Sequence, residues 1–183
     1  MTNQHIKKLV LAAMFAALTC AATMVVRVPS PTNGYVNLGD CLVLLAAWLL
    51  GPLYGALAAG IGSALADLLS SYPHYVPGTF VIKGLMALTA ALLSRGMTRA
   101  HLHAAAAAAI SGLAAEAEMV AGYFLYSCLI LGRGLAAAAS VPGNLFQGAF
   151  GLIAAVILVV ILKQNRTLAR LTAADAAGNG RGH

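Results

Sequence analysis

The stretch that decides how this chain folds runs from residue 41 to residue 66 and reads CLVLLAAWLLGPLYGALAAGIGSALA. It contains no Asp, Glu, Lys or Arg, so its composition alone would allow one long membrane helix. Gly51-Pro52 lies near its middle, however, and Gly-Pro is a strong turn signal. A turn at this point predicts two helices, 38–50 and 53–71, that form a short hairpin.

The rest of the chain has the same apolar character. Of its 183 residues, 61% are hydrophobic and only 9% are charged, whereas soluble domains carry about 25% charged residues. Because about 20 apolar residues cross a bilayer as a helix, several of the uncharged stretches are long enough to span it. They are rich in Ala and Leu and lack the alternation of an outer-membrane barrel. The composition therefore predicts an all-α integral membrane protein.

The remaining apolar stretches predict four further helices, at 6–26, 79–94, 104–130 and 141–163, which makes six in total. The first run is too long for a secretory signal, so we expect it to be retained. With both termini cytoplasmic, eight Lys and Arg residues lie inside and three lie outside, as the positive-inside rule requires. A five-span alternative, in its better orientation, places seven Lys and Arg residues inside and four outside. Because the two charge distributions differ little, the choice of six helices depends largely on the Gly-Pro turn.

The six helices predict one transmembrane domain, 1–171, followed by a disordered Ala/Gly-rich tail, 172–183. The second and third helices would be shorter than the hydrocarbon core of roughly 30 Å. The net charge of +6 is better explained by membrane topology and by contact with anionic lipid than by binding to nucleic acid. The three cysteines are isolated and form no ligand pattern, so neither a metal site nor a cofactor is expected.

Polar side chains gather in the outer half of the predicted membrane domain. Asp40 begins the second helix there, Asp67 ends the third, and Lys83 lies early in the fourth. Asn144 and Gln147 share a face of the sixth helix because they are three residues apart. Ionisable groups are costly in a membrane and usually face an interior or water-filled site. The cluster predicts a pocket open to the outside, although Asp67 and Lys83 could also simply neutralise each other.

Two further features lie near this cluster. Glu116 and Glu118 are about 200° apart around one helix, so they face different directions. Glu116 shares its face with Tyr123, which favours it as a ligand wall, but the sequence leaves open which glutamate faces the pocket. Tyr75, in the proline-rich outer loop 71–78, could stack on a ligand ring or anchor the chain at the membrane surface.

Short motifs then connect these residues to a known family. They are YVNLGD at 35–40, GPLYG at 51–55, ALADLL at 64–69, YPHY at 72–75, IKG at 82–84 and PGNLFQG at 142–148. Over residues 6–163 the chain resembles the substrate-binding S components of energy-coupling-factor (ECF) vitamin transporters. It is most similar to the branch named after riboflavin-type S components.

The resemblance implies a six-helix protein of the cell membrane, not an enzyme, that binds a vitamin or vitamin precursor near the outer face. It implies docking through Ala13 and Ala17 of the first helix onto a transmembrane coupling (T) subunit. Two cytosolic ATPase subunits would supply the energy, consistent with the absence of a Walker-type loop in this sequence. The acidic, amide-rich pocket favours a vitamin B6-type ligand or hydroxymethylpyrimidine, with riboflavin as a further candidate. The expected ligand-binding residues are Asn37, Asp40, Asp67, Tyr75, Lys83, Glu116, Glu118, Tyr123, Asn144 and Gln147.

Two other classes of function compete with this interpretation. A stand-alone secondary transporter or channel would more often show internal repeats, and none is visible here. An intramembrane enzyme would need paired catalytic groups, yet no nucleophile accompanies His74 and no metal-ligand spacing such as His-x-x-x-His occurs. Ligand binding by the isolated protein, and ATP dependence of uptake, separate these classes.

Overall fold

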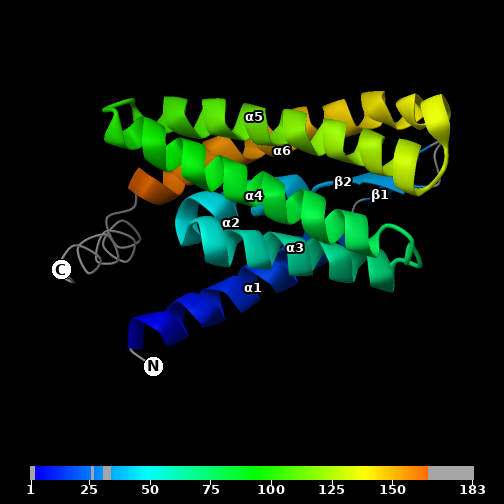
Figure 1. Ribbon diagram of the computed structural model, residues 1–183. Helices are drawn as coiled ribbons and strands as arrows, with labels where there is room; N and C mark the ends of the chain where they lie inside the picture. Colours follow the sequence, from blue (N-terminus) through cyan, green and yellow to red (C-terminus); the bar gives the residue numbers. More distant parts are fainter. Residues whose placement is uncertain (1–2, 26, 31–33, 165–183) are drawn as a thin grey trace.

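The computed structural model describes residues 3–25, 27–30 and 34–164 (Figure 1). The predicted tail, 172–183, lies outside this part of the chain. The six predicted helices are confirmed within a residue or a few of their expected bounds. They are α1 (Asn3–Val25), α2 (Gly39–Leu50), α3 (Pro52–Leu69), α4 (Val76–Arg99), α5 (Ala104–Leu125) and α6 (Val141–Gln164). A π-helical turn, η1 (Tyr126–Ile130), prolongs α5, and a 3-10 helix, η2 (Gly134–Ser140), leads into α6.

The turn between α2 and α3 is made by Gly51-Pro52, as predicted. Gly51 has φ +85° and ψ −174°, a conformation that is essentially restricted to glycine. Pro52 follows at the first position of α3, where its missing N–H costs nothing. Helix α2 has 12 residues and is about 18 Å long, too short to span the bilayer. Helix α3 has 18 residues and is about 27 Å long, slightly shorter than the hydrocarbon core as predicted, yet it is long and apolar enough to cross the membrane.

Helix α2 lies inside the bundle, where α1, α3, α4 and α6 surround it. Val43, Leu44 and Ala46 of α2 are completely buried and pack into the core. Protein rather than lipid therefore covers α2, and its short length creates no mismatch with the bilayer. The other five helices are long enough to cross and expose many leucine and isoleucine side chains on their outer faces. Such exposed aliphatic surface is what lipid contact requires.

The loop between α1 and α2 forms a two-stranded hairpin. Strand β1 (Arg27–Ser30) pairs antiparallel with β2 (Gly34–Asn37), with Arg27 opposite Asn37. The hairpin lies at the end of the bundle opposite the start of α1 and the end of α6 (Figure 1). Strand β2 contacts α1 and α6. The charge distribution assigns this end of the bundle to the outside, so the hairpin covers the outer end of α2.

Candidate functional site

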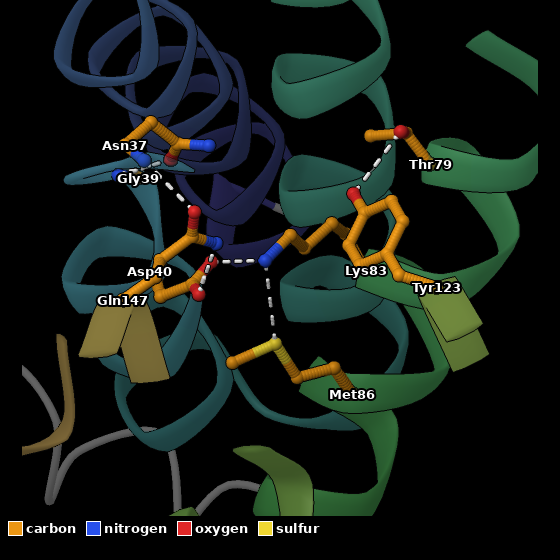
Figure 2. A network of polar contacts seen from close by, with 8 residues as sticks. All are labelled: Asn37, Gly39, Asp40, Thr79, Lys83, Met86, Tyr123 and Gln147. Carbon is orange, nitrogen blue, oxygen red and sulfur yellow. Dashed lines mark hydrogen bonds and ion pairs between the residues drawn. The ribbon is translucent and has the colours of Figure 1, made fainter. Parts of the chain in front are cut away.

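A buried ion pair joins α2 to α4 beneath the hairpin. The Lys83 ammonium donates to Asp40 Oδ1, and Gln147 Nε2 of α6 donates to Asp40 Oδ2 at 2.7 Å (Figure 2). Gln147 Oε1 accepts from the backbone N–H of Asn37 at 2.8 Å, which ties the end of β2 to the pair. Asp40, Lys83 and Gln147 are only 0%, 2% and 4% exposed. We call these three side chains, together with Asn37, the central network.

Glycines and a local turn hold the central network in place. Asp40 lies in the first turn of α2, where the helix dipole favours a negative charge. The Asn37 side chain accepts from the Gly39 N–H at 2.8 Å and so fixes the approach of the chain to α2. On α6, a Cβ at Gly151 would lie 2.7 Å from Asp40 Cβ, so glycine is needed for α6 to come this close to α2.

The apolar stem and ammonium of Lys83 also contact α5 and their own helix. The ammonium lies 3.9 Å from Met86 Sδ and 5.5 Å from the centre of the Tyr123 ring. The Tyr123 hydroxyl in turn donates to Thr79 Oγ1 at 3.0 Å (Figure 2). Thr79 and Met86 were not predicted. Their spacing of four and three residues from Lys83 places all three on one face of α4, and this spacing is the signal that could have found them.

Glu116 lies at the inner edge of a crevice between α5 and α6. Its side chain is only 5% exposed, and no donor among the described residues reaches either of its carboxyl oxygens. A Cβ at Gly148 would lie 2.9 Å from Glu116 Oε2, so this glycine makes room for the carboxyl group. The crevice has a volume of about 190 Å³, and its remaining walls are aliphatic: Leu113, Ala117, Val120, Leu145, Ala149 and Leu152.

The outer loop before α4 is fastened to the end of α5. Tyr75 is buried, and its ring centre lies 6.4 Å from that of Tyr123 and 6.2 Å from that of Tyr126. Arg133 Nη1 donates to the Tyr75 hydroxyl at 2.6 Å, and the Tyr126 hydroxyl donates to the His74 carbonyl at 2.8 Å. The structure thus brings the predicted Tyr75 next to Tyr123. No sequence spacing links Tyr126 or Arg133 to this loop, so their part was not predictable.

The remaining predicted residues are not among the hydrogen-bond partners described for the central network. Asp67 is buried near the end of α3, while the ion pair of the Lys83 ammonium is with Asp40, a partner that was not predicted. Asn144 and Glu118 are half-buried, and neither takes part in the hydrogen bonds of the network. The described residues contain no group of three His, Cys, Asp or Glu side chains that could hold a metal ion.

The small residues of α1 divide between two faces. Ala12 and Ala16 are buried against the bundle, and Ala16 backbone atoms lie close to Gly62 of α3. Ala13 and Ala17 are exposed on the outer side of the helix. The two alanines expected to meet a partner are therefore accessible.

Comparison with known proteins places this arrangement in a family. Residues 3–164 match the family model described as the S component of ECF-type riboflavin transporters. A protein of Pyrococcus woesei without an assigned function is 36% identical over 143 residues, which cover 78% of this chain and 92% of that protein. The thiamine precursor transporter HmpT of Lactococcus lactis subsp. cremoris (strain MG1363) is 28% identical over 170 residues, covering 92% of this chain and 95% of HmpT.

Solved structures share the fold at lower sequence identity. The S component of a bacterial ECF transporter superposes with a TM-score of 0.68 at 19% identity, covering 87% of this chain and 97% of the other. The biotin S component of an ECF-type ABC transporter gives a TM-score of 0.68 at 20% identity, covering 91% and 95%. With the family match over nearly all described residues, this chain belongs to the S components of ECF-type vitamin transporters, in the riboflavin-type branch.

Proposed function

We propose that this S component binds a vitamin or precursor with a single heteroaromatic ring, of the hydroxymethylpyrimidine or pyridoxine type. The central network carries the proposal, because charged groups buried at membrane depth are costly and commonly mark a binding site. The crevice beside Glu116, at about 190 Å³, is smaller than the roughly 300–1,000 Å³ of typical drug-sized sites. A single ring therefore suits it better than the three fused rings and sugar chain of riboflavin. The similarity to a thiamine precursor transporter supports the same choice.

The proposed ligand-binding side chains come from four elements of the fold. Lys83 and Gln147 offer donors, Asp40 offers acceptors, and Tyr123 offers a ring face beside them. We include Glu116 rather than Glu118, because the Glu116 side chain is buried and its two carboxyl oxygens have no hydrogen-bond partner among the described residues. The fastened loop that carries Tyr75 closes the outer side of this group. Binding would require the ligand to compete for hydrogen bonds that the network now makes with itself.

We further propose that the exposed face of α1 docks onto the coupling subunit of an energizing module. Ala13 and Ala17 are four residues apart, and small residues at this spacing let two membrane helices approach closely. Larger side chains flank them on the same exposed surface, with Val10 53% and Met14 54% exposed. Cytosolic ATPases bound to that coupling subunit would drive delivery of the ligand.

A thermal-shift panel on the detergent-purified chain tests the ligand class. The panel contains hydroxymethylpyrimidine, pyridoxine, riboflavin, thiamine and biotin. A ligand that binds only the folded state adds about 2.7 kcal/mol at 100 times its Kd, so the correct compound gives a clear shift. A shift with riboflavin alone would contradict the single-ring proposal. No shift with any compound, in protein shown to be folded and ligand-free, would contradict the vitamin-binding role of the network.

Transport in cells tests the partner proposal separately. Ala13→Trp together with Ala17→Trp places bulky side chains on the exposed face of α1 and should abolish ATP-dependent uptake while ligand binding to the purified protein persists. The matched control is Leu11→Trp, an exposed position about 200° around the same helix from Ala13. Uptake that continues after ATP depletion would favour a stand-alone secondary transporter.

A further inference from the structure

Arg133 is not among the predicted site residues, yet a short hydrogen bond joins it to Tyr75. Its backbone N–H donates to the Ser127 carbonyl at 3.1 Å, which ties it to the start of η1. Its Nη1 donates to the Tyr75 hydroxyl at 2.6 Å, and its guanidinium carbon lies 5.5 Å from the centre of the Tyr75 ring. Because a hydrogen bond from a charged donor is roughly twice as strong as a neutral one, Arg133 can fix the hydroxyl end of this ring.

Tyr75 connects this arginine to the central network. It precedes Lys83 by eight residues, which is about 12 Å along the helix axis, so it lies on the outer side of Lys83. It is only 7% exposed, and its ring centre lies 6.4 Å from that of Tyr123. The Tyr123 ring centre in turn lies 5.5 Å from the Lys83 ammonium (Figure 2). A continuous row of contacts therefore runs from Arg133 to the buried ion pair.

A different residue holds the backbone of the same loop. The Tyr126 hydroxyl donates to the His74 carbonyl at 2.8 Å. The Tyr126 ring also packs on Gly78, where a Cβ would lie 2.6 Å from ring carbons. Neither contact involves Arg133, so the loop backbone and the Tyr75 ring are held by separate residues. The effect of Arg133 can therefore be measured apart from the anchoring of the loop.

We infer that Arg133 is a positioning residue that holds the Tyr75 ring against Tyr123, on the outer side of the central network, and thereby slows the release of bound ligand. The inference rests on the proposed function and adds a residue that controls retention without belonging to the ligand-binding group. A ligand that leaves toward the outer face passes the buried Tyr75 ring. Without the bond to Arg133 this ring turns aside more readily, so dissociation becomes faster while association changes little.

Three variants of the full-length purified chain test this inference. Arg133→Gln removes the charged donor, and Tyr75→Phe keeps the ring but removes the hydroxyl that accepts from it. The double variant shows whether the two side chains act through each other. The matched control is Arg99→Gln, the same change at an exposed arginine in the last turn of α4. The probes are hydroxymethylpyrimidine and pyridoxine, and the readouts are their association and dissociation rates.

A second readout needs no ligand. The protein is labelled with 3-fluorotyrosine, and the fluorine NMR signals of Tyr75 and Tyr126 are assigned by their loss in Tyr75→Phe and Tyr126→Phe. Arg133→Gln should move the Tyr75 signal more than the Tyr126 signal, because the guanidinium donates to the Tyr75 hydroxyl. Arg99→Gln should move neither signal.

Arg133→Gln and Tyr75→Phe should each speed dissociation about tenfold and leave association within about twofold. The double variant should release the probe no faster than either single variant. Unchanged dissociation in Arg133→Gln, multiplied effects in the double variant, or a Tyr75 signal that does not move would overturn the inference and leave the proposed function standing.

If Arg133→Gln fails to fold, Tyr75→Phe breaks the same bond from its other side, and an unchanged dissociation rate in that variant overturns the inference. Failure of both probes to bind the native protein would contradict the single-ring proposal and, with it, the role of Arg133 in release. The fluorine signals would then still decide whether Arg133 positions Tyr75.

Discussion

Removal of the Lys83 charge should destabilise the protein strongly. Lys83→Met keeps most of the length of the side chain but removes the ammonium from Asp40, which is 0% exposed. Breaking a buried ion pair on one side costs about 3–5 kcal/mol, because the other charge is left buried. The Gln147 amide still donates to Asp40 Oδ2, and a hydrogen bond to a charged group contributes about 1.5–3 kcal/mol. We therefore expect the free energy of unfolding to fall by about 3 kcal/mol, near the lower end of the range.

The double variant Asp40→Asn with Lys83→Met separates charge burial from packing. Replacing both members of a buried pair is often close to neutral, so the double variant should regain most of the lost stability while ligand binding stays abolished. Unfolding can be followed through Trp48, the single tryptophan, whose Nε1 donates to Ser111 Oγ of α5 at 3.2 Å. Its fluorescence thus reports the packing of α2 against α5.

The control is Lys7→Met, which removes an exposed lysine near the start of α1 and should change stability little. Additive effects of the Asp40 and Lys83 substitutions would show that the two side chains do not interact energetically. A loss below 1 kcal/mol for Lys83→Met would also refute the reasoning, because it would mean that water reaches the pair.

Three further substitutions have expected outcomes. Gly51→Ala forces a glycine conformation on a residue with a Cβ and should lower unfolding stability by about 1–3 kcal/mol; a smaller loss would show that the α2–α3 turn relaxes. Gln147→Ala removes a donor from Asp40 and should speed ligand release, because the end of β2 is no longer tied to the network; unchanged dissociation rates would exclude this link. Tyr126→Phe removes the hydrogen bond to the His74 carbonyl and should cost about 1 kcal/mol, with faster hydrogen exchange in the outer loop before α4; equal exchange would show that the loop is held by other contacts.

The sequence predicts the helices of this fold well because their signals are local. Gly51-Pro52 specifies the hairpin by itself, and the chain indeed turns there. The gathering of Asp40, Lys83 and Gln147 also follows from topology, since each lies near the outer end of its helix. The sequence did not predict which carboxylate forms the ion pair with Lys83. Only Asp67 was considered as a neutralising partner of Lys83, whereas in the structure α2 packs against α4 and its Asp40 forms the ion pair.

Features that depend on rotation or on local deviation from a regular helix were harder to predict. The 200° between Glu116 and Glu118 shows that they diverge but not which one faces α6, because helix rotation is set by packing. The close approach at Gly148 settles the matter in the structure. No strand was predicted between the first two helices, since each strand of the β hairpin is only four residues long and the first contains a proline.

The π-helical turn at Tyr126–Ile130 marks a position where evolution can remove or add one residue without breaking the helix. A hydrogen bond from the Leu131 N–H to the Tyr126 carbonyl encloses one more residue than an α-helical bond would. Loss of a single residue here would restore a regular helix and turn everything beyond it by about 100°. The membrane span would survive such a deletion, but Arg133 would no longer point toward Tyr75. A lineage that gains or loses one codon at this site therefore changes how the outer loop is held without having to rebuild the helix that carries it.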